Sequence, residues 1–149
     1  MTTLVPRRAA TSARLLVDFA RERGIDTHLV LRGTGLPAEG LSDPTSEITD
    51  EQELALIRNL VAELDDAPGC GFTLGASYQA AVHGIYGYAL MSCATVREGI
   101  EVGTRYFDLS YAFSRATLAY ADGEVRFSLE DREVPVDVRG FLLERDLSG

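Results

Sequence analysis

The sequence predicts an α+β fold, with several packed helices, a small antiparallel β-hairpin or sheet, and a C-terminal helix. Apolar residues first recur at helical spacing behind repeated helix-start signals. After Tyr111 the apolar residues recur with a period of two, as in a β-strand. Asp122-Gly123 interrupts this pattern as a hairpin turn would. A helical pattern then returns after Pro135. Because 149 residues is the length of one ordinary domain, we expect residues 1–149 to form a single domain.

Two helices are expected before residue 36. The first is capped by Thr11 or Ser12 and runs to about Arg23. A second, short helix follows Asp26 and cannot continue through Pro37, which lacks a backbone donor. The apolar side of the first helix is formed by Leu15, Leu16 and Phe19.

The next helix has the strongest start signal in the chain. Residues 36–48 read as a loop that ends in an extended step at Glu47-Ile48. Thr49 and Gln52 then have the spacing of a capping box. In this helix Leu54, Ile57, Val61 and Leu64 recur at helical spacing, before a break at 65–69.

The stretch from His83 to Tyr111 is rich in glycine and tyrosine. After one or two helical turns at Phe72–Gly75, residues 84–91 predict a short helix, in which Gly84 and Gly87 would allow close packing. Thr95 and Glu98 form a second capping-box pattern. The helix behind it would place Val96, Ile100, Gly103 and Phe107 along one apolar stripe.

A turn at Asp122-Gly123 fixes the register of the hairpin, because residue 121 then faces residue 124. Leu118 faces Phe127, and Arg115 faces Glu130 on the opposite side, so one register gives both an apolar face and a charge pair. Two strands alone are marginally stable. We therefore expect further pairing, either with the segment near Ile48 or with a second copy of the chain.

Composition excludes several functions. The net charge of −9 argues against DNA binding by this segment alone, since a DNA-binding surface needs concentrated positive charge. No apolar run is long enough to span a membrane, and residues 1–16 lack the apolar core of a secretory signal, which predicts a cytoplasmic location. Two distant cysteines and two histidines give no metal-ligand spacing, and no phosphate-binding glycine motif occurs, so we expect neither metal nor cofactor.

The order of these signals resembles a known family. The resemblance is carried mainly by the residues GIYGYALMS at 84–92, TVREG at 95–99 and Arg105-Tyr106-Phe107. Gly35-Leu36-Pro37 and the capping box at 49–52 also contribute to it. The chain resembles the N-terminal effector-binding and dimerisation (arabinose-binding-like) domain of AraC-type transcription regulators. The resemblance covers nearly the whole chain.

The resemblance implies a small-molecule effector, whose identity the family name does not give, and a homodimer. It also implies that DNA is bound by a separate C-terminal helix-turn-helix domain, which is absent from this sequence, and that the domain is not an enzyme. Three readings stay open: a ligand sensor, a pure dimerisation module, or a small hydrolase or isomerase that uses His83.

Aromatic hydroxyls and an imidazole can orient a ligand in an apolar pocket, but aromatic residues at helical spacing equally form core. His83 serves either a ligand or a local cap, and Arg115 pairs either with a ligand carboxylate or with Glu130. A nucleophilic pair of Cys93 and His83 would need an orienting group and an oxyanion site, and neither is signalled. The candidate ligand-binding residues are His83, Tyr86, Tyr88, Tyr106, Tyr111 and Arg115.

Overall fold

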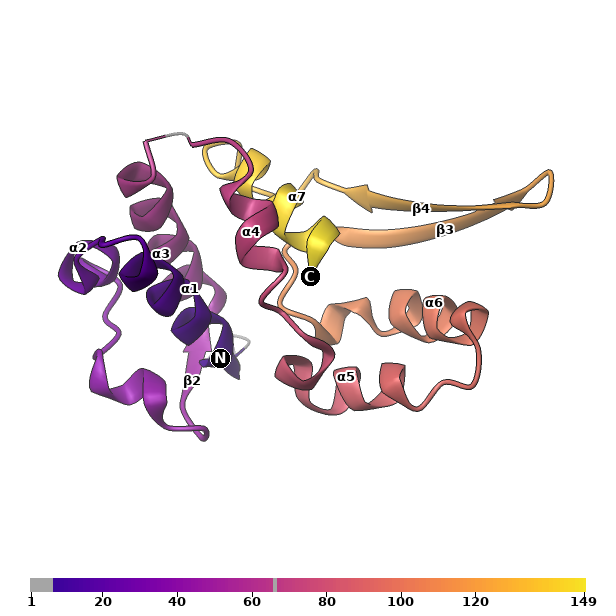
Figure 1. Ribbon diagram of the computed structural model, residues 1–149, viewed down its shortest axis with the longest axis horizontal. Coiled ribbons are helices and arrows are strands. Elements are labelled where there is room, and N and C mark those ends of the chain that lie inside the picture. Colours follow the sequence, from indigo (N-terminus) through magenta and orange to yellow (C-terminus); the bar gives the residue numbers. More distant parts are fainter. Residues whose placement is uncertain (1–6, 66) are drawn as a thin grey trace, which may run out of the picture. The chain divides into compact units, whose positions relative to one another are not determined.

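The computed structural model describes residues 7–65 and 67–149 and has the predicted α+β architecture (Figure 1). Its contacts fall into two compact units, Met1–Pro68 and Gly69–Gly149, each described here by itself. The predictions about a secretory signal and about Asp66 in the helix break fall at least partly outside the described residues. Within them, no helix is long and apolar enough to cross a membrane.

The first unit is a small helical bundle with one short strand pair. Strand β1 (Arg7–Ala9), which the sequence analysis did not predict, runs antiparallel to β2 (Glu47–Thr49) and places Arg8 opposite Ile48. A strand of three residues is too short to show an alternating pattern. The elements are β1 (Arg7–Ala9), α1 (Thr11–Glu22), α2 (Thr27–Leu31), the 3₁₀ helix η1 (Glu39–Ser42), β2 (Glu47–Thr49) and α3 (Asp50–Glu63).

Neither Thr11 nor Ser12 caps α1, contrary to the prediction. Ala10 occupies the N-cap position and makes no side-chain bond there. The Ser12 hydroxyl instead donates to the carboxylate of Glu53 on α3, and the guanidinium of Arg8 lies 3.5 Å from the same carboxylate. Ser12 and Glu53 are fully buried, and a buried carboxylate requires donors, which explains why the hydroxyl is used here.

At both ends of α2, side chains form hydrogen bonds with backbone groups of the helix. Asp26 is its N-cap, and its carboxylate accepts from the backbone N–H of His28 at 2.9 Å. At the other end, the Asn59 amide on α3 donates to the carbonyls of Val30 and Arg32, at 3.0 and 2.8 Å. These bonds fasten α2 to α3.

The capping box and the helix α3 are confirmed. The Thr49 hydroxyl accepts from the Gln52 N–H, and the Gln52 side chain accepts from the Thr49 N–H. Of the four apolar residues noted at helical spacing only Ile57 is fully buried, because the face containing Glu53 turns inward to meet Ser12. The buried residues of α3 are Glu53, Leu56, Ile57 and Leu60.

The second unit contains the predicted hairpin and four α-helices. Helix α5 has the predicted bounds, whereas α7 begins at Arg139 rather than at Pro135, because residues 135–138 form a turn closed by a bond from Val138 N to Pro135 O. The elements are α4 (Cys70–Gly75), η2 (Ala80–His83), α5 (Gly84–Met91), α6 (Val96–Arg105), η3 (Phe107–Leu109), β3 (Arg115–Ala121), β4 (Glu124–Glu130) and α7 (Arg139–Ser148).

The hairpin has the predicted register. Asp122 and Gly123 both have positive φ, 52° and 80°, as the tight turn requires, and Leu118 faces Phe127. The expected pairing with the segment near Ile48 is wrong: β2 pairs with β1, and in the described part of the chain β3 and β4 form a two-stranded sheet (Figure 1). Pairing with a second copy stays a prediction.

Close backbone approach occurs at one of the two expected glycines, Gly87, and also at a glycine that was not expected, Gly71. On α4, which lies beside α7 (Figure 1), a Cβ added at Gly71 would come within 2.3 Å of the Phe141 carbonyl oxygen. On α5, a Cβ at Gly87 would come within 1.5 Å of the Ala80 carbonyl oxygen, so this predicted contact is confirmed. Gly84 instead has open space beside it and a φ of +56°, so it is needed for its backbone conformation.

Helix α6 has the predicted start and a different environment. The Thr95 hydroxyl caps it by accepting from the Glu98 N–H at 3.2 Å. The Glu98 carboxylate accepts from the N–H of Ala94, the residue before Thr95, whereas a capping box would use the N–H of Thr95 itself. The predicted apolar stripe is confirmed, because one groove is lined by all four of its residues, Val96, Ile100, Gly103 and Phe107, but the stripe is not a packed core. Val96 is 81% exposed and no residue of α6 is fully buried, because the apolar side of the helix borders an open groove.

Candidate functional site

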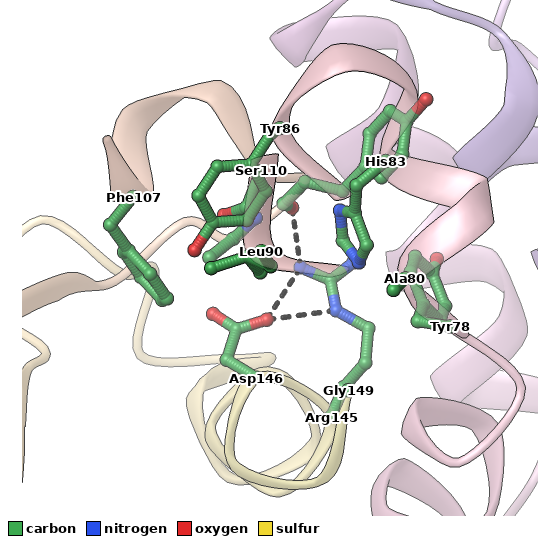
Figure 2. A pocket seen from close by; sticks show the side chains of 12 residues that line it. Tyr78, Ala80, His83, Tyr86, Leu90, Phe107, Ser110, Arg145, Asp146 and Gly149 are labelled. Atoms are coloured by element: carbon green, nitrogen blue, oxygen red, sulfur yellow. Dashed lines mark hydrogen bonds and ion pairs between the residues drawn. The ribbon is translucent and has the colours of Figure 1, made fainter. Parts of the chain in front are cut away.

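A pocket of about 170 Å³ lies within the second unit (Figure 2). Its walls come from segments far apart in the sequence: η2 and α5, η3 with the residues after it, and α7. Most of the wall is aromatic or aliphatic, and one ion pair on α7 adds charge. The lining side chains include Tyr78, Ala80, His83, Tyr86, Leu90, Phe107, Ser110, Tyr111, Ala112, Arg145 and Asp146.

The structure brings together half of the predicted candidates. His83, Tyr86 and Tyr111 all line the pocket. Tyr88 does not, because two residues along a helix is more than half a turn, and its side chain is 69% exposed on the other side of α5. Tyr106 is 48% exposed outside the pocket.

Arg115 also lies outside the pocket. It faces Glu130 across the hairpin as predicted, but its ion pair is made with Glu133, at 3.3 Å. Both side chains of that pair are largely exposed. Its observed role is therefore a surface charge contact at the base of the hairpin.

Three tyrosine rings surround the imidazole of His83 in the aromatic part of the wall. Its ring centre lies 5.3 Å from that of Tyr111, 5.8 Å from Tyr86 and 6.0 Å from Tyr78. The rings are tilted or edge-on to each other, which is the favoured geometry for aromatic neighbours. Tyr78 was missed by the sequence analysis, since it lies in an irregular segment before the glycine-rich stretch.

The hydroxyls of Tyr86 and Tyr111 in the wall have structural partners. Tyr86 donates to the carbonyl of Gly103 at 2.9 Å and thereby links α5 to α6, and burial raises the pKa of Tyr86. Tyr111 donates to the carbonyl of Val82 at 3.4 Å. These side chains present their rings to the pocket while their hydroxyls fix the surrounding backbone.

His83 differs from the tyrosines in this respect. Its Nδ1 atom is buried, and no group in the described residues forms a hydrogen bond with it. Burial, and secondarily the positive charge of Arg145, lower the pKa of His83 below its ordinary value of 6.5. The imidazole is therefore neutral at pH 7, and its Nδ1 atom is a polar nitrogen in the aromatic part of the wall.

The ion pair of Arg145 and Asp146 forms the polar side of the pocket (Figure 2). The Arg145 Nε and Nη2 atoms donate to Asp146 Oδ1 at 2.9 and 2.8 Å, and Nη2 also donates to the Tyr111 carbonyl at 2.8 Å. The other carboxylate oxygen accepts from the Ser114 hydroxyl at 2.9 Å and from the Phe113 N–H at 3.2 Å.

Both charged side chains are only 2% exposed, so the pair fastens α7 to the segment before the hairpin from inside the unit. The sequence analysis did not propose either residue for the site. The available signal was Arg145 itself, a charged residue that recurs with the apolar positions of the final helix.

A second hollow, a groove of about 700 Å³, lies between α5, α6, β4 and the end of α7. Cys93 lines this groove and His83 lines the other pocket, so they share no common pocket. The Cys93 thiol donates to the Ala89 carbonyl at 3.3 Å. The arrangement does not assemble the Cys93 and His83 pair considered from the sequence.

The fold and the pocket together define an α+β module with a hollow of small-molecule size. A family model described as the N-terminal arabinose-binding domain of AraC transcription regulators matches residues 24–149. The chain therefore belongs to this family, which confirms the resemblance predicted from its sequence.

Two similar proteins are described as uncharacterized HTH-type transcriptional regulators, one from Mycobacterium bovis and one from Mycobacterium tuberculosis. Each is 35% identical to this chain over 143 residues. The match covers 96% of this chain and 42% of the relative. The chain thus spans less than half the length of these relatives.

Proposed function

We propose that this chain is the effector-sensing and self-associating part of a cytoplasmic AraC-type transcription regulator. In this proposal it influences DNA binding through a helix-turn-helix domain elsewhere in a longer parent protein. Its own net charge of −9 makes direct contact with DNA phosphates unfavourable. The family membership and the greater length of both relatives support this division of labour.

The observation that carries the proposal is the pocket in the second unit. A cavity of about 150 Å³ lined by apolar side chains is large enough to hold benzene, so 170 Å³ suits a small molecule. Because its walls come from η2, α5, η3 and α7, a bound ligand would favour one arrangement of these elements. Such a preference is the physical requirement for passing a binding signal to another domain.

A ligand screen by thermal unfolding tests this proposal. Ala112 lines the pocket, so Ala112→Leu adds three carbon atoms to its wall, whereas Ala119→Leu makes the same change on the exposed side of β3. An effector in 100-fold excess over its Kd stabilises the protein by about 2.7 kcal/mol. We expect it to raise the Tm of the wild type and of Ala119→Leu, but not that of Ala112→Leu. A shift of equal size in all three proteins would contradict binding in the pocket.

A separate observation supports self-association. Helix α5 is apolar on every side, and a helix of this kind is normally buried, yet Ile85 and Tyr88 are 81% and 69% exposed. We propose that a second copy of the chain covers this face. Ile85→Glu should weaken the dimer in sedimentation equilibrium by at least about tenfold, whereas Val136→Glu, at a residue 80% exposed, should not. A monomer at high protein concentration would refute this part of the proposal.

For His83 we propose a binding role rather than catalysis. A general base needs a hydrogen-bonded partner that orients it, and Nδ1 of His83 has no such partner in the described part of the chain. The hydrolase or isomerase alternative therefore has no supporting geometry around this residue. Measurable turnover that His83→Phe abolished would favour the alternative.

A further inference from the structure

We propose that the pocket beside α7 selects an uncharged, single-ring aromatic molecule with one hydroxyl or amide group that forms a hydrogen bond with His83 Nδ1. This inference rests on the proposed effector-sensing function and adds the chemical class of the effector. Three properties of the pocket carry it: its size and walls, the buried Nδ1 atom of His83, and the ion pair of Arg145 and Asp146.

The size and the walls specify a single ring. At about 170 Å³ the pocket is smaller than the 300–1,000 Å³ typical of sites for drug-sized ligands. Phe107 and the rings around His83 line it, with Leu90 from α5. Aromatic side chains favour offset or edge-on contact with another flat ring, so a planar ligand gains more than a puckered one of equal area.

The polar group of the ligand is specified by His83. Its buried Nδ1 atom has no hydrogen-bond partner among the described residues, and a buried polar atom without one is unfavourable. The hydroxyls of Tyr86 and Tyr111 already donate to backbone carbonyls. A ligand hydroxyl can both donate and accept, and therefore suits either tautomer of a neutral imidazole.

The charge of the ligand is specified by the pair on α7. Arg145 and Asp146 are 2% exposed and bonded to each other, so their charges balance inside the unit. A ligand carboxylate would be a second buried anion beside Arg145, whose guanidinium already pairs with the carboxylate of Asp146. A ligand ammonium group would face the Arg145 guanidinium. Neither charged group would regain the solvation it loses on entry.

Isothermal titration calorimetry at pH 7.5 tests the hydrogen bond. Phenol and toluene share one ring and differ in the hydroxyl, and phenol should bind the wild type about fivefold more tightly. His83→Phe keeps a ring of similar size and removes the nitrogens, so it should reduce this ratio to about one while toluene still binds. His28→Phe makes the same change on the exposed surface of α2 and should leave the ratio unchanged.

Two further pairs of compounds test charge and planarity. Benzamide and benzoate have similar shapes and differ in charge, and benzamide should bind at least about tenfold more tightly. Phenol should bind about threefold more tightly than cyclohexanol, which carries the same hydroxyl on a puckered ring. Ala112→Leu should abolish binding of all these compounds, and Ala119→Leu should not.

Each contrary result has a defined meaning. If benzoate bound as tightly as benzamide, or if His83→Phe left the ratio of phenol to toluene unchanged, the proposed class would be wrong although the pocket would still be a binding site. If none of these compounds bound while the thermal screen found a ligand sensitive to Ala112→Leu, the class would again be wrong and the effector-sensing function would stand. If neither experiment found a ligand, both proposals would fall.

Discussion

The substitution Asp146→Asn is expected to destabilise the second unit strongly. Asn has nearly the shape of Asp but no negative charge, and its NH₂ group cannot accept a hydrogen bond. The Asp146 carboxylate accepts five hydrogen bonds, two from Arg145 and three from Phe113 and Ser114. The amide oxygen can replace only one of the two carboxylate oxygens, so one group of donors loses its acceptor.

The loss is large because the pair is buried. With both side chains 2% exposed, removal of the carboxylate leaves the charge of Arg145 without its ion-pair partner, which typically costs about 3–5 kcal/mol. At a urea m-value of about 2 kcal/mol/M, this corresponds to a fall of about 2 M in the unfolding midpoint. Circular dichroism during urea unfolding measures this shift.

The control uses the same substitution at an exposed pair. The Asp131 Oδ2 atom lies 3.4 Å from Arg139 Nε in the same unit, and the side chains of Asp131 and Arg139 are 43% and 35% exposed. Asp131→Asn should therefore cost no more than about 1 kcal/mol. The double variant Arg145→Met/Asp146→Asn removes the buried charge as well and should be more stable than Asp146→Asn alone. Equal losses for Asp146→Asn and Asp131→Asn would refute this description of the ion pair.

Substitutions at three other features give separate tests. Gly87→Ala should lower the free energy of unfolding by about 3 kcal/mol or more, since the added Cβ would lie 1.5 Å from the Ala80 oxygen, whereas Gly140→Ala has open space and should stabilise by about 0.5–1 kcal/mol in urea unfolding. Thr49→Ala should cost about 1 kcal/mol through loss of the capping box, measured by thermal unfolding; no loss would contradict the cap. Because burial and the nearby guanidinium lower the pKa of His83 in the folded state, the unfolded state takes up its proton more readily below pH 6.5. Stability should then be complete above pH 6.5 and fall as the pH decreases, and His83→Phe should reduce that fall in unfolding curves measured from pH 5 to 7.

Local signals in the sequence were sufficient for the capping box of α3 and for the hairpin. The capping box at Thr49 and the turn at Asp122-Gly123 depend on residues close together in the chain, and a turn with two positive φ values allows one register. The register then follows residue by residue, from Ala121 opposite Glu124 to Arg115 opposite Glu130. The cap predicted for α1 was wrong because Ser12 makes a tertiary contact with Glu53 instead.

The helix faces were harder to predict because tertiary contacts choose between them. On α3, one set of apolar residues at helical spacing contains Leu54 and another contains Leu56. The hydrogen bond from Ser12 to Glu53 decides which of these faces turns inward. On α6 the apolar side borders a groove instead of a packed core. Periodicity shows that a helix has an apolar side without showing what covers that side.

The candidate site was predicted in part for the same reason. His83, Tyr86 and Tyr111 were identifiable by residue type within one stretch of sequence. Arg145 and Asp146 come from the other end of the unit, and only the packing of α7 brings them to the pocket. No local pattern carries that information, although an arginine among the buried positions of a helix is itself unusual.

Native mass spectrometry of the domain, purified without denaturation from the cells that naturally produce it, tests most directly whether the pocket holds an effector. The wild type and Ala119→Leu should each carry one small molecule per chain that is released on unfolding, and Ala112→Leu should carry none, because its added side chain occupies the pocket. The mass and fragmentation of the released molecule should identify an uncharged single-ring compound. The same molecule retained by Ala112→Leu would contradict its placement beside His83.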